Sequence, residues 1–226
     1  MPQNGIHAIA GMAARRWMPQ RDWLLLGIVL GNMFPDLDNL AVAYATLTGG
    51  DTHGLHRTFT HSIFTILAVA VVFYLIAVLS GNRKWNNFGI GLGIGILMHI
   101  LLDLVLWFNG VELFWPIRYE LNFWRGFETP EWLGILLETG EFLAFGLYFL
   151  LLVSLAKRLN ADAEYWSSTR LWMYIELALF VLFTILFFSM GRDGLPYTVF
   201  GALYLASVLV AFVITIRMRK TVETLS

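Results

Sequence analysis

The chain contains five stretches that are long and apolar enough to cross a membrane as helices. They cover residues 62–80, 89–108, 132–156, 171–190 and 196–216. A helix needs about 20 mostly apolar residues to span the hydrocarbon core of a bilayer. Only 14% of the residues are charged, against roughly 25% in soluble domains. The sequence therefore predicts an all-α fold, a polytopic membrane helical bundle.

A sixth stretch, residues 23–47, is long enough to span a membrane but contains Pro35, Asp36 and Asp38. Proline interrupts helical hydrogen bonding, and a broken helix at membrane depth is tolerated where it is buried in protein or lines a cavity. We therefore expect five to six transmembrane helices, with a broken or re-entrant segment near residues 23–47. We also expect a short helix over residues 4–18.

The most informative polar residues are four histidines and three aspartates within the first 103 residues. Ionisable side chains in membrane segments are costly and therefore point to function. Histidine nitrogen and aspartate oxygen bind zinc and similar divalent ions, and the absence of cysteine excludes thiolate ligands. The candidate metal ligands are His7, Asp36, Asp38, His56, His61, His99 and Asp103.

The spacing within these clusters suits metal binding. His99 and Asp103 are four residues apart, which puts both on one face of a helix, about 6 Å apart. His56 and His61 lie where a loop enters the helix predicted from residue 62, and Thr60 or Ser62 is expected to cap that helix. Asp36 and Asp38 are so close that they repel each other unless a cation or proton intervenes.

Three further charged residues are candidates for roles beside the metal. Arg57 lies next to His56 and is suited to binding an anionic oxygen such as that of a phosphate. Glu138 and Glu141 share one face of the 132–156 segment, at about the depth of Asp103 and His99. We therefore expect these acids to act as a general base, an extra ligand or a partner of a ligand histidine.

The remaining composition limits the partners and the domain organisation. A net charge of −1 gives no basic footprint for nucleic acid. We find no linker or repeat, so we expect a single integral membrane domain over residues 1–226. Residues 1–118 would form its metal-site half, and residues 119–226 would add transmembrane helices.

The distribution of basic residues favours one orientation. With six spans and a cytoplasmic N-terminus, the outer side would carry only Arg57, Arg118, Arg125 and Arg192, and the inner side the other Lys and Arg residues. That topology puts His7 across the membrane from the ligands that it should join. A re-entrant 23–47 segment would remove this conflict, but it would almost abolish the charge bias.

Five motifs follow one another along residues 5 to about 118. They are His7, Pro35-Asp36-x-Asp38, His56-Arg57-x-Phe59-Thr60-His61-Ser62, His99-x-x-x-Asp103 and Gly110-Val111-x-Leu113-Phe114-Trp115-Pro116. In this order they resemble the YdjM-like family of inner-membrane metal-dependent hydrolases. The family is itself similar in motif order to the zinc-dependent phospholipase C and P1 nuclease superfamily. The resemblance implies the plasma (inner) membrane of a prokaryote, and Asp103 as a ligand bridging two zinc ions.

We therefore expect a membrane-embedded metal-dependent hydrolase that uses one or two divalent ions, with zinc the first candidate. A phosphoester of a lipid or other amphiphilic substrate is the expected target, and Asp38, Glu138 and Arg57 are the expected catalytic residues. Two alternatives remain open. One is transport of a divalent metal, and the other is a membrane scaffold that a structural ion stabilises without catalysis.

Overall fold

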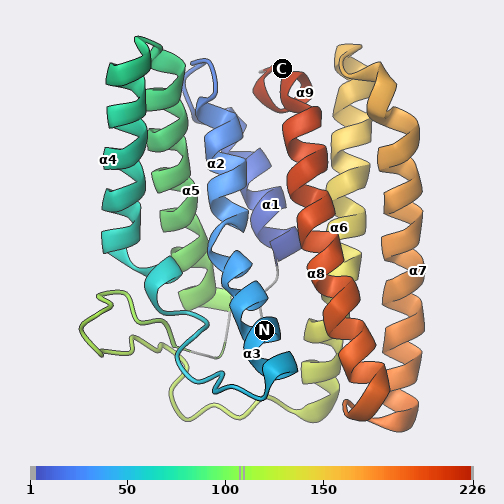
Figure 1. The fold of residues 1–226 in the computed structure, drawn as a ribbon. Coiled ribbons are helices and arrows are strands. Elements are labelled where there is room, and N and C mark those ends of the chain that lie inside the picture. Colours follow the sequence, from blue (N-terminus) through green and yellow to red (C-terminus); the bar gives the residue numbers. More distant parts are fainter. Residues whose placement is uncertain (1–3, 107, 109, 225–226) are drawn as a thin grey trace. The chain divides into compact units, whose positions relative to one another are not determined.

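The computed structural model describes residues 4–106, 108 and 110–224, and these residues are mostly helical (Figure 1). Five helices are long and apolar enough to cross a membrane. They are α4 (Ile63–Ser80), α5 (Arg83–Leu106), α6 (Glu131–Leu159), α7 (Trp166–Met190) and α8 (Gly194–Arg217). The shorter helices are α1 (Asn4–Ala13), α2 (Leu24–Met33), α3 (Asn39–Thr48) and α9 (Arg219–Glu223). The prediction of a helical membrane bundle is confirmed.

The predicted break after α2 is also present. The helical segments Leu24–Met33 and Pro35–Thr48 meet at a bend of 42°. Taken together, they are long and apolar enough to form a sixth span. Pro35 begins a short 3-10 helix, Pro35–Asp38, that joins α2 to α3. Because proline has no amide hydrogen and cannot continue the α-helical pattern, the bend begins at this residue. The break places Asp36 and Asp38 in this 3-10 helix, where both are buried.

By their internal contacts, the described residues divide into two units. The N-terminal unit comprises Ala10–Phe127, and the C-terminal unit comprises the residues up to Ile9 together with Glu128–Thr224. Helix α1 thus contributes its first residues to one unit and its last residues to the other. The prediction of a single domain over residues 1–226 stays a prediction.

Helices α2 and α5 of the N-terminal unit pack with their backbones in close contact. All ten residues of α2 are buried. A Cβ atom on Gly91 or Gly95 of α5 would overlap the backbone oxygen of Leu24 or Ile28, respectively. Small residues allow this close approach between membrane helices. Gly91 and Gly95 therefore set the distance between α5 and α2, the helix that leads into the break.

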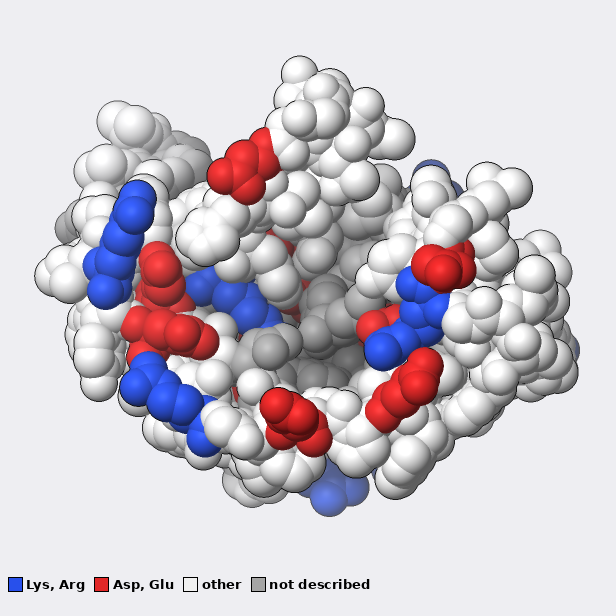
Figure 2. All heavy atoms as spheres, turned by 90° about the horizontal axis from the view of Figure 1, so that it is seen from below, with Lys and Arg blue, Asp and Glu red and all other residues white. Residues whose placement is uncertain are grey.

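The two ends of the N-terminal unit carry different groups. At one end, the Lys84 ammonium lies 3.0 Å from the Asp22 carboxylate, and the rings of Trp23 and Trp85 contact each other. Asp103 is 20 residues further along α5 than Arg83, which corresponds to about 30 Å. His99 and Asp103 therefore lie toward the opposite end. Figure 2 views the molecule from below, where both signs of charge are scattered over a mostly uncharged surface.

A hairpin-like loop follows α5 and is hydrogen-bonded to the start of α4. Val111 and Leu121 form an antiparallel bridge. The Ile63 amide donates to the Leu113 oxygen at 3.0 Å, and the Ser62 hydroxyl donates to the Trp115 oxygen at 3.1 Å. Ser62 also accepts from the Phe64 amide at 3.2 Å, so it caps α4. Of the two predicted caps, Ser62 is the one that the structure uses.

The C-terminal unit is built on α6, α7 and α8. Rings of Phe142, Phe183 and Phe200, one from each helix, contact one another in its buried core. The Gly5 amide at the start of α1 donates to the Glu141 carboxylate at 3.0 Å. Glu141 is ten residues into α6, or about 15 Å along its axis. The start of α1 therefore lies inside this unit, about 15 Å along α6 from its first residue.

Gly95→Ala tests the close packing of α2 and α5. The added methyl group would meet backbone atoms of Ile28 and Asn32, which cannot move away as a flexible side chain can. We expect a loss of about 1–3 kcal/mol in stability, the usual effect of overpacking, measured as a lower unfolding midpoint in detergent. Gly201→Ala is the matched control, because no atom lies within 4 Å of its added Cβ. Equal midpoints for both variants would contradict the proposed contact.

Candidate metal centre

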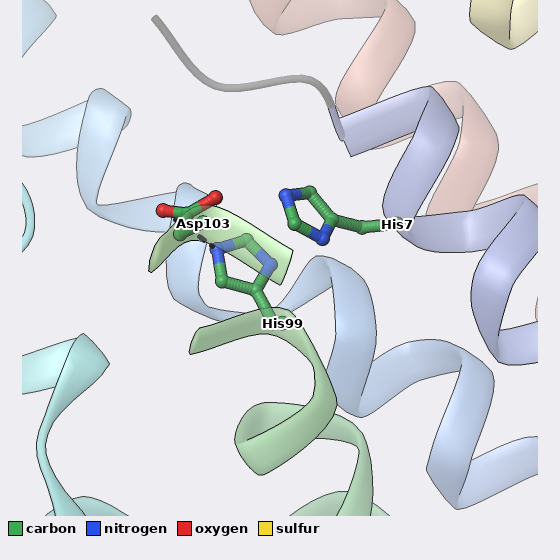
Figure 3. Close-up of side chains that lie close together, drawn as sticks. All are labelled: His7, His99 and Asp103. Atoms are coloured by element: carbon green, nitrogen blue, oxygen red, sulfur yellow. Dashed lines mark ion pairs between the residues drawn. The ribbon is translucent and has the colours of Figure 1, made fainter. Parts of the chain in front are cut away.

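His99 and Asp103 are buried one helical turn apart near the end of α5. Figure 3 shows the two side chains together, with their ion pair dashed. The His99 Nε2 atom lies 3.7 Å from the Asp103 Oδ2 atom, and both residues are at most 1% exposed. The turns of α5 around them carry the apolar residues Ile96, Ile100 and Leu104, which pack into the core of the N-terminal unit. The two polar side chains are therefore held inside an otherwise apolar helix.

Asp36 and His61 complete a group of four donor atoms with this pair. His61 Nε2 lies 3.1 Å from His99 Nε2, and Asp36 Oδ1 lies 3.9 and 3.6 Å from these two nitrogens. Asp103 Oδ2 lies 3.6 Å from His61 Nε2. The four side chains come from the 3-10 turn after α2, the 3-10 turn Phe59–His61 and helix α5. All four residues are buried.

A backbone hydrogen bond fixes the tautomer of His99. Its Nδ1 atom lies 2.6 Å from the backbone oxygen of Asn32, at the end of α2. A carbonyl oxygen can only accept a hydrogen bond, so Nδ1 carries the hydrogen. In the neutral ring, Nε2 is then left with an unshared lone pair.

A chain of two hydrogen bonds fixes the tautomer of His61 in the same sense. The Thr60 hydroxyl donates to Asp38 Oδ2 at 2.7 Å and lies 2.9 Å from His61 Nδ1. Since its single hydrogen goes to the carboxylate, the hydroxyl accepts from His61 Nδ1. The Nε2 atom of His61 therefore also presents a lone pair, and it faces the lone pair of His99.

Two facing lone pairs with carboxylate oxygens on either side require a positive charge between them. Zinc ligands lie about 2.0–2.2 Å from the metal, so neighbouring donors of a tetrahedral site are about 3.4 Å apart. The five distances that join the two Nε2 atoms to each other, to Asp36 Oδ1 and to Asp103 Oδ2 run from 3.1 to 3.9 Å. The donor set of two neutral imidazoles and two carboxylates thus fits one divalent ion.

Asp38 forms hydrogen bonds with three residues that lie next to the four candidate ligands. Its Oδ1 atom lies 2.6 Å from His56 Nδ1, and its Oδ2 atom accepts from the Thr60 hydroxyl and, at 3.2 Å, from the Arg57 amide. Carboxylates that bind the far nitrogen of a ligand histidine fix its tautomer and orientation. The predicted role of Asp38 as a direct ligand stays a prediction, and its hydrogen bonds make it a positioning residue for His56 and His61.

His56 offers a further nitrogen. Since its Nδ1 atom bonds Asp38, the Nε2 atom is left, and this buried atom has no hydrogen-bond partner among the described residues. Burial lowers the pKa of His56 below its ordinary value, although the hydrogen bond with Asp38 acts in the opposite direction. Its ring is perpendicular to that of His61, with 5.5 Å between the ring centres. Asp38, His56 and His61 form a second group whose donor atoms are close enough for an ion.

Arg57 brings a positive charge to the edge of the site. Its φ angle of 62° lies in the left-handed region, which is unfavourable for a side chain other than glycine. The backbone is held there because its amide donates to Asp38 and its oxygen accepts from the Glu112 amide at 3.0 Å. The guanidinium is buried, lies 3.6 Å from Asp103 Oδ2 and forms no hydrogen bond within the described part of the chain.

Three predicted site residues belong to the C-terminal unit. His7 is buried on α1, Glu138 accepts from the Arg192 guanidinium at 2.9 Å, and Glu141 accepts from the Gly5 amide. These three residues belong to a different unit from the other candidate ligands. The roles of His7 as a ligand and of the two acids at the metal therefore stay predictions. Within its own unit, Glu138 joins α6 to the turn between α7 and α8.

Sequence reasoning missed two groups that matter here. Thr60 was expected only as a helix cap, but its hydroxyl links Asp38 to His61. The backbone oxygen of Asn32 orients His99. A threonine directly before a ligand histidine could have suggested the first contact. The second depends on backbone placement and carries no signal in the side-chain pattern.

Asp38→Asn tests the positioning role. An amide in place of the carboxylate can no longer accept from His56, Thr60 and the Arg57 amide together. We expect zinc affinity to fall about 10–100-fold, as for other groups that orient ligand histidines, measured by competition with a fluorescent chelator. Asp51→Asn is the control, since Asp51 is an exposed acid of the loop that carries His56. Unchanged affinity in Asp38→Asn would refute the role.

The comparisons with known proteins agree with the family resemblance. Residues 4–194 match the family model described as YdjM inner membrane protein. No curated protein and no solved structure matched the chain. The family description supports an inner-membrane location and names no activity. The wider likeness to the zinc-dependent phospholipase C and P1 nuclease superfamily is not supported by these comparisons.

Proposed function

The chain belongs to the YdjM inner membrane protein family, and from that premise we propose that it is a membrane-embedded metal-dependent hydrolase. Its substrate would be a phosphoester of a lipid or other amphiphile. The observation that carries the proposal is the 3.1 Å distance between the Nε2 atoms of His61 and His99, which lie beside the oxygens of Asp36 and Asp103. Such an arrangement is costly inside a protein unless a cation occupies it.

Asp36, His61, His99 and Asp103 would hold one ion, and zinc suits their nitrogen and oxygen donors. The Nε2 atom of His56 would be the added ligand if a second ion binds. A bound divalent ion supplies Lewis acidity, which lowers the pKa of water toward about 7 and polarises the bond under attack. Around it, Asp38 and Thr60 keep the hydrogen of His61 on Nδ1, so that its other nitrogen stays free to bind.

Arg57 would bind the anionic part of the substrate. A buried guanidinium with unused donors favours a ligand that can accept several hydrogen bonds, and a phosphate offers this geometry. In hydrolysis, water oxygen bonds to phosphorus, the bond from phosphorus to the alcohol oxygen breaks, and the alcohol leaves with a proton. Arg57 would hold the phosphate oxygens during this exchange and offset their charge next to Asp103.

The surroundings of the site favour a lipid or amphiphilic substrate. The loop after α5 is hydrogen-bonded to Arg57, Ser62 and Ile63, beside the site. It exposes large apolar side chains, including Phe123, which is 63% exposed. Aromatic residues of this kind concentrate where membrane and water meet. A substrate with a phosphate group and an apolar tail would reach the site from this interface.

The first test is His99→Ala in purified protein. Loss of one imidazole should reduce the bound divalent metal, measured by mass spectrometry of the elements, and should lower hydrolysis of a chromogenic phosphodiester and of phosphatidic acid to background. His53→Ala is the matched control, because His53 is an exposed histidine in the loop between α3 and the 3-10 turn Phe59–His61. A wild-type protein that binds neither zinc nor manganese would contradict the proposal.

The second test separates substrate binding from metal binding. Arg57→Gln should leave the metal content unchanged and lower kcat/KM about 10–100-fold, the effect of losing a hydrogen bond to a charged group. Arg57→Lys should restore part of the activity because it keeps the charge. Arg118→Gln, which removes an exposed arginine from the loop after α5, is the control. Full activity in Arg57→Gln would show that this residue does not bind substrate.

Metal transport and a structural ion remain the alternatives. Uptake of zinc into proteoliposomes, lost in His99→Ala, would favour transport. Metal that stabilises the protein while no phosphoester is hydrolysed would favour a structural ion.

A further inference from the structure

A groove of about 230 Å³ lies between α7 and α8 in the C-terminal unit. It is found where α7 begins and α8 ends, at the top of these helices in Figure 1. Its lining is divided by chemistry. Leu209, Val213 and Ile214 of α8 form an apolar wall, whereas Ser168 and Arg217 supply polar atoms.

The apolar and polar parts follow one another along α8. Leu209 and Arg217 are eight residues apart, or about 12 Å along the helix axis. Arg217 is the last residue of α8, so the polar part lies at the end of the span and the apolar part lies deeper in the membrane. This order matches a phospholipid, which has a charged headgroup at the membrane surface and an acyl chain beneath it.

The Arg217 side chain is positioned before any ligand binds. Its guanidinium carbon lies 5.8 Å from the centre of the Tyr165 ring, a cation–π contact. Among the described residues, no carboxylate forms an ion pair with Arg217. An aromatic face leaves the hydrogens at the edge of the guanidinium available for another acceptor. The arginine is thus held at the mouth of the groove without being neutralised.

A buried clasp fixes the chain on both sides of this contact. Asp162 accepts from the amide and from the hydroxyl of Thr221, both at 2.8 Å. The Tyr165 amide donates to the Asp162 oxygen at 3.0 Å. The turn before α7 is therefore tied to α9, which begins two residues after Arg217. The walls of the groove are preorganised, which lowers the entropic cost of binding.

The charge at this end of the unit favours an anionic ligand. The basic residues here are Lys157, Arg158, Arg170, Arg217, Arg219 and Lys220, and the acidic residues are Asp162, Glu164 and Glu223. Asp162 is buried in the clasp. An end rich in basic residues is typical of the cytoplasmic side of an inner-membrane protein. Anionic lipids of the cytoplasmic leaflet are attracted to such basic sites.

We propose that this groove binds one anionic phospholipid of the surrounding membrane. The phosphate of its headgroup would lie against Arg217, and one acyl chain would run along Leu209 and Val213. Trp172, which also lines the groove, would lie at the level of the headgroup and glycerol. This site is separate from the candidate metal centre in sequence and in residue type, and its occupant would be retained rather than hydrolysed.

The test measures lipid binding to the full chain in a neutral detergent. Native mass spectrometry should show one dioleoyl phosphatidylglycerol bound to the wild-type protein, with dioleoyl phosphatidylcholine bound more weakly. Arg217→Gln should weaken phosphatidylglycerol binding about fivefold, as expected for one basic residue near a membrane surface. Val213→Trp keeps the charge but fills the apolar part, and it should weaken binding of both lipids.

Arg170→Gln and Arg219→Gln are the controls, since both residues are exposed at the same end but do not line the groove. Both should bind phosphatidylglycerol like the wild type, and so should His99→Ala, which separates this test from that of the hydrolase proposal. Wild-type binding in both Arg217→Gln and Val213→Trp would overturn the proposal. So would equal binding of the two lipids to the wild type, or competition by inorganic phosphate at the lipid concentration.

Discussion

The close contact between α2 and α5 is the constraint on which the candidate site depends. Gly27 and Gly31 of α2 and Gly91 and Gly95 of α5 leave no room for a Cβ atom against the facing backbone. Only at this short separation can His99 reach the backbone oxygen of Asn32. Side-chain packing between membrane helices has little hydrophobic driving force, so fit and hydrogen bonding decide the distance. The glycines thus determine where the imidazole points.

Hydrogen bonds among polar residues then fix the side chains of the site on these two packed helices. Asp38 gathers the His56 ring, the Thr60 hydroxyl and the Arg57 amide, and through Thr60 it sets the tautomer of His61. Both carboxylate oxygens of Asp38 are hydrogen-bonded, which holds these groups in one arrangement. The left-handed backbone at Arg57 is the strained element of the network, and its neighbours on both sides hold it in place.

The helices could largely be predicted from sequence, since hydropathy detects the part of a helix in lipid. Hydropathy does not detect the polar ends of a helix that extend beyond the lipid. Helix α5 begins at Arg83, six residues before the predicted segment, and α7 begins at Trp166 rather than 171. The pairing of His99 with Asp103 follows from helical spacing. The roles of Thr60 and Asn32 depend on contacts between distant segments, and depth alone could not say that Glu138 faces Arg192.

The break after α2 has a consequence for folding itself. Asp36 comes from that break, His61 from the turn before α4, and His99 and Asp103 from the end of α5. An ion bound by all four would tie three separate segments of the N-terminal unit at one point. Binding would then add directly to the stability of the folded chain. Metal supply in the cell would set how much of the protein reaches its folded form, before any substrate is met.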